Sequence, residues 1–362
     1  MSSNLGIINF KQWLNLEGPL LICGPCGAES EEQLVETAKK ISEIQGVKIF
    51  RAGVWKPRTR PNSFEGMGEI ALEWLKKVQQ ETGLKTAIEV ANAKHVEKAL
   101  KHGVDIIWIG ARTTVNPFSV QEIADSLRGV DVPILIKNPV HPDLQLWVGA
   151  IERILQIGNK KIVAVHRGFH NPKQSEFRND PFWEIAIELR TIFTDLPVIT
   201  DPSHIGGRRS KILSISQKAI NLGMDGLMIE SHINPECALS DKEQQLHPED
   251  LKQLIDKLIF RKVSTDKKEL KNTLFHLRKI IDELDEEMIL LLKKRSDIIE
   301  KIGLFKAEHD ITIFQLERWM EILRTRTESA TGKGIPKDFI EKICLLLHEE
   351  SIRKQHEVMN KE

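Results

Sequence analysis

The chain has 362 residues, of which 41% are hydrophobic, and its 52 basic side chains are balanced by 52 acidic ones. This neutral balance argues against binding to nucleic acid or to an anionic membrane surface, and the hydrophobic content is that of a folded protein. The chain shows no signal-peptide pattern, no apolar run of about 18 residues that could span a membrane, and only four cysteines, too few for a disulfide framework. We therefore expect a cytoplasmic protein with reduced thiols.

Residues 20–258 alternate short apolar runs with amphipathic segments. Helical periodicity occurs at 30–45, 68–81, 94–102 and 211–222, and several of these segments end near a glycine. Eight β–α units in about 240 residues match an α/β fold of the (β/α)8 TIM-barrel type. A doubly wound sheet is the alternative, but the chain lacks both the Gly-rich dinucleotide fingerprint and a P-loop. The predicted strands are residues 20–26, 48–55, 85–90, 105–112, 133–138, 161–167, 196–204 and 226–231.

Charged side chains recur where the predicted strands end. Each of them interrupts or ends an apolar run, and the carboxyl ends of barrel strands form the active-site rim. Several like charges in one place are costly unless anions pair with them, so we expect a ligand that carries phosphate and carboxylate groups. The cations are Arg51, Lys56, Arg58, Arg112, Lys137 and Arg167, and Glu89 ends the third strand.

A second set of residues near the strand ends has the chemistry of metal ligands. One thiol, one imidazole and two carboxylates suit a divalent first-row metal such as Mn, Fe, Zn or Co. Cys23 precedes Cys26 by three residues, an odd separation that places the two on opposite faces of a strand, so only Cys26 is taken as a ligand. The predicted ligands are Cys26, His204, Glu230 and Asp241.

Short motifs at these positions follow one another along the whole barrel segment: Gly24-Pro25-Cys26, Lys56-Pro57-Arg58-Thr59, Gly110-Ala111-Arg112, Lys137, His166-Arg167-Gly168, Asp201-Pro202-Ser203-His204, Ile229-Glu230 and Ala238-Leu239-Ser240-Asp241. Together they resemble 3-deoxy-D-arabino-heptulosonate 7-phosphate (DAHP) synthase, of the shorter type related to octulosonate-phosphate synthases. The resemblance implies a metal-dependent condensation of phosphoenolpyruvate with erythrose 4-phosphate.

The resemblance also assigns roles for phosphoenolpyruvate. Arg112 and Arg167, helped by Lys137, are implied to hold its phosphate. Arg51 and Lys56 are implied to lie near its carboxylate. These charges position two anions that repel each other and stabilise the charge that develops during the reaction.

The remaining roles concern the sugar and the metal. Arg58 and Thr59 are implied to bind the phosphate of erythrose 4-phosphate, with help from Asp201. Glu89 and Ala111 are also counted among the substrate-binding residues of the barrel. A divalent metal ion, first Mn²⁺ and otherwise Fe²⁺, Co²⁺, Zn²⁺ or Cd²⁺, is implied to polarise the aldehyde as a Lewis acid.

The pattern changes after residue 260. A charged segment at 261–269 indicates a linker, and from Leu270 on apolar residues recur close to a heptad period. The first glycine is Gly303, which predicts one helix of about 38 residues, followed by shorter helices near 313–328 and 336–359. Those two cannot cover the whole apolar stripe, so a second chain is predicted to pair along it. The expected domains are a barrel at 1–260, the linker, and a small all-α three-helix domain at 270–362 that makes the protein at least a homodimer.

Polar residues distinguish this tail from a plain coiled coil. Arg295 and Lys306 are eleven residues apart, about 20° around a helix, so they share a face, whereas Arg278 lies about 100° from it. Together with Ser351 and Gln355, and within Leu277-Arg278-Lys279-Ile280-Ile281-Asp282, these residues resemble the all-helical chorismate mutase, a dimer with shared sites.

This second resemblance implies that Arg278 from the partner chain and Arg295 bind the two carboxylates of chorismate. Lys306 and Gln355 are implied to hydrogen-bond its ether oxygen, and Ser351 belongs to the same site. Two positions depart from the family pattern, because Gln315 and Trp319 stand where acidic contacts to the ring hydroxyl are usual.

Three readings of the whole chain follow. The first is a bifunctional shikimate-pathway enzyme whose helical domain also controls the barrel. The second is a monofunctional DAHP synthase whose tail is a non-catalytic dimerisation and effector-sensing module. An assay of the isolated tail with chorismate as substrate would distinguish the first two interpretations. The third is a sugar-phosphate aldolase on the same barrel, which would use a Schiff-base lysine and would not respond to a chelator.

Overall fold

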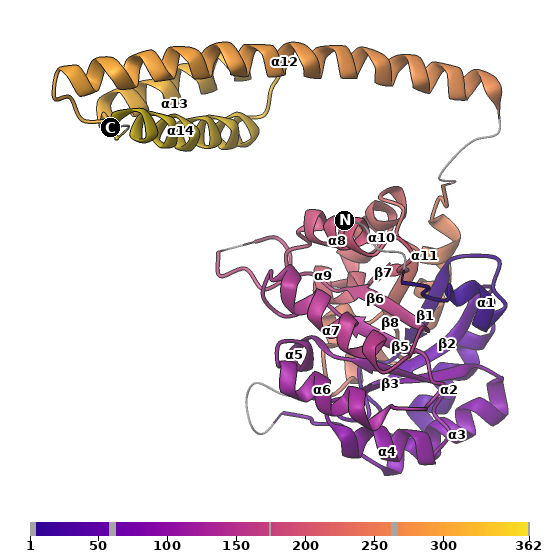
Figure 1. Ribbon diagram of the computed structural model, residues 1–362. Helices are drawn as coiled ribbons and strands as arrows, with labels where there is room; N and C mark the ends of the chain where they lie inside the picture. The colour runs from indigo at the N-terminus through magenta and orange to yellow at the C-terminus, as the bar shows by residue number, and fades with distance from the viewer. Residues whose placement is uncertain (1–4, 58–62, 174, 262–266, 361–362) are drawn as a thin grey trace. The chain divides into compact units, whose positions relative to one another are not determined.

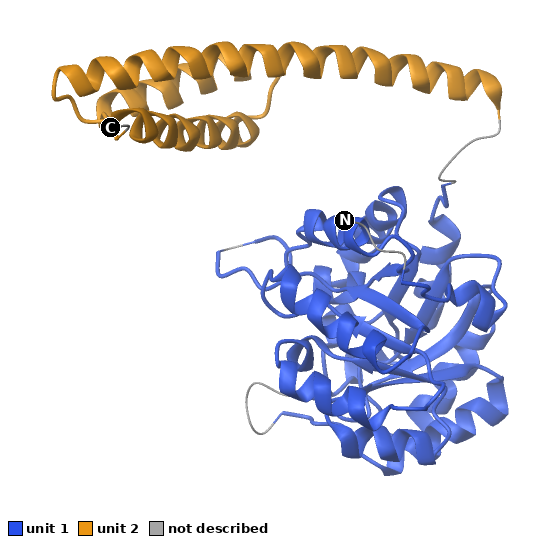
Figure 2. Ribbon diagram, viewed as in Figure 1, with its two compact units in different colours: residues 1–263 blue, residues 264–362 orange. Residues whose placement is uncertain are grey.

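The computed structural model describes residues 5–57, 63–173, 175–261 and 267–360 (Figure 1). The chain divides into two compact units, Met1–Val263 and Ser264–Glu362 (Figure 2). Each unit has its own secondary structure, and each is described separately below.

The first unit is a closed barrel of eight parallel strands, paired in chain order from β1 to β8 and back to β1. This confirms the predicted fold class and the position of every predicted strand. The strands are β1 Leu20–Gly24, β2 Val47–Ala52, β3 Lys85–Val90, β4 Ile106–Ile109, β5 Ile134–Lys137, β6 Ile162–His166, β7 Val198–Thr200 and β8 Gly226–Glu230.

Several predicted strands were too long, and in two of them a short helix begins at the barrel mouth, within the predicted strand. The segment expected at 196–204 ends at Thr200, because Asp201 caps helix α9 (Pro202–Gly206) and accepts from the backbone N–H of His204. The segment expected at 105–112 ends at Ile109, because Gly110 precedes helix α5 (Ala111–Thr114). His204 and Arg112 therefore project from helical turns at the mouth.

Helices surround the barrel (Figure 1). Most begin at a residue whose side chain accepts a backbone N–H of the first turn, as Ser30, Asn92, Asn116 and Asp143 do. The outer helices are α2 Glu31–Ser42, α3 Ile70–Thr82, α4 Ala93–Lys101, α6 Pro117–Ser126, α7 Leu144–Gln156, α8 Trp183–Ile192, α10 Arg209–Asn221 and α11 Pro248–Lys257, and two 3-10 turns, η1 Pro235–Cys237 and η2 Lys242–Gln244, follow β8.

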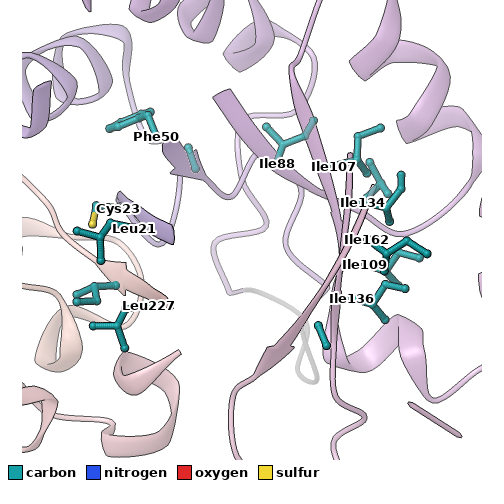
Figure 3. Close-up of a cluster of buried hydrophobic side chains, with 14 of the residues drawn as sticks. Leu21, Cys23, Phe50, Ile88, Ile107, Ile109, Ile134, Ile136, Ile162 and Leu227 are labelled. Carbon is teal, nitrogen blue, oxygen red and sulfur yellow. The ribbon is translucent and has the colours of Figure 1, made fainter. Parts of the chain in front are cut away.

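Alternating strand residues build two apolar layers, because successive side chains of a strand point to opposite faces. Leu21, Cys23 and Phe50 belong to the layer that packs against the helices (Figure 3). Leu20 and Ile22 belong to the layer that fills the barrel, together with Phe10 of α1 (Phe10–Leu14). The backbone N–H of Ile8, just before α1, bonds to the carbonyl of Lys160 ahead of β6, so α1 closes the amino end of the barrel.

The second unit contains three helices, α12 Lys268–Glu308, α13 Leu316–Thr331 and α14 Lys337–Met359. The carboxyl-terminal part of α12 packs against α14, where a Cβ on Gly303 would lie only 3.2 Å from the Cα of Gln355. Residues 268–294 of α12 are exposed in the single chain, including its predicted apolar stripe from Leu270 to Leu291. None of the described helices, α12 included, has an apolar stretch that could cross a membrane.

Candidate active sites

The barrel mouth brings three of the four predicted metal ligands together. The sulfur of Cys26 and carboxylate oxygens of Glu230 and Asp241 lie within 4.8 Å of one another. Cys26 follows β1, Glu230 ends β8, and Asp241 precedes η2, so the closed barrel makes neighbours of residues more than 200 positions apart. We call these three residues the metal triad.

The donor set of the metal triad fits a divalent cation. Burial, followed by the charge of Glu230, raises the pKa of the Cys26 thiol to about 12, so a thiolate here needs a nearby cation. Among the described residues, Glu230 Oε1 is buried and accepts no hydrogen bond, although Arg51 Nη2 lies 3.3 Å away. One sulfur and two carboxylates with an unused oxygen are what a borderline-soft metal ion accepts.

The fourth predicted ligand lies beside this triad. His204 Nε2 is 3.8 Å from Glu230 Oε1, and its Nδ1 is 2.8 Å from Asp201 Oδ2. Asp201 is fully buried, and its carboxylate lies against Nδ1, which leaves Nε2 of His204 on the side of Glu230. In the described part of the chain, Asp201 contacts His204 and Lys137, and its expected contact with the sugar phosphate stays a prediction.

Two buried cations, Arg51 and Lys137, lie next to Glu230 and Asp201 respectively. Arg51 is 2% exposed, and its Nε and Nη1 have no hydrogen-bond partner among the described residues. Lys137 is 4% exposed, and its ammonium lies 2.8 Å from Asp201. Both cations lie over the ring of Trp108, Arg51 at 4.9 Å and Lys137 at 5.7 Å from its centroid. Unused buried N–H groups of this kind suit the anionic end of a small substrate.

Arg167 and Arg112 extend the positive surface toward solvent. Burial lowers the pKa of Arg167 to about 10, and the charges of Arg178 and Arg112 act in the same direction. Its Nη1 donates to Asn179 Oδ1 at 2.8 Å. Arg112 is exposed on α5, near enough to Arg167 for their charges to interact.

The structure also describes the predicted barrel residues Lys56, Glu89 and Ala111. Lys56 Nζ lies 2.5 Å from Cys26 Sγ and 3.1 Å from Ser240 Oγ, so its charge faces the metal triad. Glu89 accepts the indole N–H of Trp108 at 3.0 Å, and Ala111 begins α5 above β4. Arg58 and Thr59 lie outside the described residues.

Trp108 and Arg178 contribute to this site and were not predicted. Trp108 lies within the apolar run of β4 and has no feature that separates it from the core in the sequence. Arg178 lies in an irregular segment, where periodicity is uninformative, and its Nη1 donates to Asp241 Oδ1 at 3.0 Å. Both contact residues that were predicted for the site.

The helical unit holds a cavity of ≈ 790 Å³ between α12, α13 and α14. Four predicted residues line it: Arg295, Lys306, Ser351 and Gln355. Lys306 is 8% exposed, and burial lowers its pKa while its ammonium donates to the carbonyl of Ile313 at 2.7 Å. Gln355 Oε1 is buried and has no partner among the described residues.

The same cavity contains both positions that depart from the chorismate mutase pattern, Gln315 and Trp319. The ring of Trp319 stacks on His348 with centroids 4.0 Å apart. Arg318 also lines the cavity and was missed, although it follows Gln315 by three residues and so shares its face of α13. Arg278 lies on the exposed part of α12 and does not line the cavity of its own chain.

Comparison with known proteins supports the family resemblance of both parts of the chain. A family model described as the DAHP synthetase I family matches residues 16–267, and one described as chorismate mutase type II matches residues 277–356. The phospho-2-dehydro-3-deoxyheptonate aldolase of Thermotoga maritima is 35% identical over 238 residues, which cover 66% of this chain and 68% of that protein. The 2-dehydro-3-deoxyphosphooctonate aldolase of Geobacter sulfurreducens is 30% identical over 261 residues, covering 66% and 90%.

A solved structure supports the same family assignment for the barrel. The crystal structure of the Thermotoga maritima aldolase, a DAHP synthase, matches with a TM-score of 0.60 at 34% identity, over 66% of this chain and 67% of that one. DAHP synthases are typically metal-dependent, and the metal triad is a possible site for the ion. The chain is therefore a bifunctional shikimate-pathway enzyme, which belongs to the DAHP synthetase I family and carries a type II chorismate mutase domain after its barrel.

Proposed function

We propose that the barrel condenses phosphoenolpyruvate with erythrose 4-phosphate at the metal triad and the cations around it. The observation that carries this proposal is the approach of Cys26, Glu230 and Asp241 to within 4.8 Å, next to the buried Arg51 and Lys137. A cation site and an anion site that share one mouth allow two phosphorylated substrates to be held side by side.

The residues then divide the work between the two substrates. Arg112, Arg167 and Lys137 bind the phosphate of phosphoenolpyruvate, while Arg51 and Lys56 bind its carboxylate. The buried, unpartnered N–H groups of Arg51 support this assignment, because a carboxylate would satisfy them. Glu89 and Ala111 are further substrate-binding residues of the barrel in this proposal.

The sugar phosphate is assigned to Arg58 and Thr59, with Asp201 at the base of the site. The metal ion is held by Cys26, Glu230, Asp241 and His204; Mn²⁺ is the first candidate, and Fe²⁺, Co²⁺, Zn²⁺ and Cd²⁺ are the others. When bound, such an ion supplies Lewis-acid polarisation of the aldehyde. The chain's own cations hold the two anions in reach of each other, which supplies orientation that solution lacks.

The test is product formation from phosphoenolpyruvate and erythrose 4-phosphate before and after treatment with EDTA. We expect the activity to disappear and to return when Mn²⁺ is added back. An activity that EDTA leaves unchanged would show that the condensation needs no metal ion and would exclude this role of the metal triad.

We further propose that the helical domain rearranges chorismate in the cavity lined by Arg295, Lys306, Ser351 and Gln355. The reaction is unimolecular, so orientation and charge stabilisation are what these side chains must supply. Arg278 of the partner chain completes each site. The division of the chain in this proposal is 1–260 for the synthase, 261–269 for the linker and 270–362 for the mutase.

A homodimer through α12 accounts for the apolar residues that the single chain leaves uncovered. Leu277, Ile281 and Leu284 are each more than half exposed and lie on the stripe predicted from the heptad spacing. We also propose that chorismate or prephenate bound in the helical domain lowers synthase activity, because both domains belong to one chain. Synthase rates that stay constant as prephenate is added would exclude this control.

A further inference from the structure

Two adjacent buried glutamines, Gln244 and Gln245, form hydrogen bonds with residues of the metal triad. They are 1% and 0% exposed, at the end of η2 and just after it. A primary amide carries both donors and an acceptor, and a buried one must find partners for both. The hydrogen-bond partners of these two amides are proposed metal ligands, the residue next to one of these ligands, or Arg178, which itself contacts the proposed ligand Asp241.

Gln244 holds one oxygen of a metal ligand. Its Nε2 donates to Glu230 Oε2 at 2.6 Å, and its Oε1 accepts from Arg178 Nη1, also at 2.6 Å. The same guanidinium nitrogen donates to Asp241 Oδ1 at 3.0 Å. Only one orientation of the amide works here, because a reversed amide would bring its oxygen against the carboxylate and its NH₂ group against the guanidinium.

Gln245 ties together the two loops that carry Cys26 and Asp241. Its Oε1 accepts the backbone N–H of Cys26 at 2.9 Å, and its Nε2 donates to the carbonyl of Ser240 at 2.8 Å. Ser240 directly precedes Asp241, whose φ of 51° is uncommon for a residue other than glycine. A backbone in this conformation persists only where its surroundings hold it.

We propose that Gln244 and Gln245 are positioning residues of the metal site. Gln244 fixes the carboxylate of Glu230, so that the other oxygen, Oε1, remains for the ion. Gln245 sets the distance between Cys26 and Asp241. Neither glutamine contacts the ion itself, and the inference rests on the metal site proposed above.

The experiment uses full-length protein that has been stripped of metal with a chelator and is then titrated with Co²⁺. Thiolate-to-cobalt charge transfer and the d–d bands report on ligation and geometry, and competition with a chelator gives the dissociation constant. The test variants are Gln244→Met and Gln245→Met, which keep the length of the side chain and remove its hydrogen bonds. The control is Gln79→Met, because Gln79 makes three hydrogen bonds, to Thr86, Gly103 and Asp105, near the amino ends of β3 and β4.

We expect each test variant to weaken Co²⁺ binding by about 10–100-fold, the usual effect of removing a group that orients a metal ligand. The d–d bands should also shift, which a general loss of stability would not cause in the folded fraction. Gln79→Met should bind Co²⁺ like the unmodified protein. Wild-type affinity and spectra in both test variants would overturn the inference.

Two further results separate the remaining possibilities. If the unmodified protein binds no Co²⁺, the metal site itself is wrong, and the role of the glutamines falls with it. If the buried variants do not fold, Arg178→Met tests the same network from its partly exposed edge, where the Arg178 side chain is 45% exposed. That variant releases Gln244 Oε1 and should weaken Co²⁺ binding; unchanged affinity would count against the inference.

Discussion

Lys137 Nζ lies 2.8 Å from Asp201 Oδ2, and both side chains are buried in the barrel mouth. Burial alone would raise the pKa of Asp201, but the charges of His204 and Lys137 hold that pKa well below its usual range. The pair therefore keeps a carboxylate ionised next to the proposed phosphate site and orients His204 from the other side.

Removal of Lys137 should affect the barrel alone. Lys137→Met leaves a buried carboxylate short of one partner, which costs roughly 3 kcal/mol or more of barrel stability. We expect synthase activity to be lost and chorismate mutase activity on the same chain to remain. Denaturant unfolding and the two assays measure this, and normal synthase turnover in the variant would exclude a role for Lys137.

Trp108 should influence the affinity for phosphoenolpyruvate through the two cations that lie over its ring. Buried cation–π contacts are worth about 2 kcal/mol, so Trp108→Leu should raise the KM for phosphoenolpyruvate by roughly tenfold or more. Trp147 is equally buried and donates one hydrogen bond, to the carbonyl of Ile136. Trp147→Leu should therefore lower stability without this change in KM, and equal KM values in the two variants would contradict the prediction.

His166 should make barrel stability depend on pH. Burial lowers its pKa from 6.5 to about 4, and its Nδ1 has no hydrogen-bond partner among the described residues, so protonation there would bury an unpaired cation. Because the folded-state pKa is depressed, the contribution to stability is complete above pH 6.5 and is lost as the pH falls toward 4. Between pH 7 and 4.5 the loss amounts to about 2–3 kcal/mol.

The control for this effect is His166→Gln, which can still donate to the carbonyl of Pro181, as His166 Nε2 does, but does not titrate. Other groups titrate equally in both proteins. The measurement is therefore the difference between the two curves of unfolding free energy against pH. Parallel curves would show that His166 is not responsible.

Shared mutase sites predict complementation between two inactive variants. Arg278→Ala and Arg295→Ala should each lose most chorismate mutase activity. In a mixed dimer one site carries both changes and the other carries neither, so re-equilibrated mixtures should recover about a quarter of normal activity. No recovery would mean that Arg278 serves the site of its own chain.

Periodicity predicted the barrel well because each strand must present apolar residues to two layers. It also located Arg51 and Lys137, since a charged side chain at the end of an apolar run can face only the open mouth. The strand limits near Arg112 and His204 were wrong, because short helices begin after Gly110 and Asp201 and are too short to show a helical period. Of these two residues, only Asp201 caps its helix with its side chain.

Other parts of the site had no comparable signal. Trp108 has the composition of a core residue, and its role becomes visible only when two cations are seen over its ring. Gln244 ends a 3-10 turn and Gln245 follows it, so neither the helical nor the strand period applies. One of their partners, Cys26, lies 219 positions from Gln245 along the chain.

Close packing of the backbone at Gly24, in the barrel mouth, couples the metal site to the anion site. A Cβ on Gly24, whose φ is 150°, would lie 2.1 Å from the carbonyl oxygen of Arg51. Any side chain there would force β1 and β2 apart and would displace Cys26 and Arg51 together. Metal preference and anion affinity therefore cannot be altered separately at this position, and attempts to redesign either property should leave Gly24 intact.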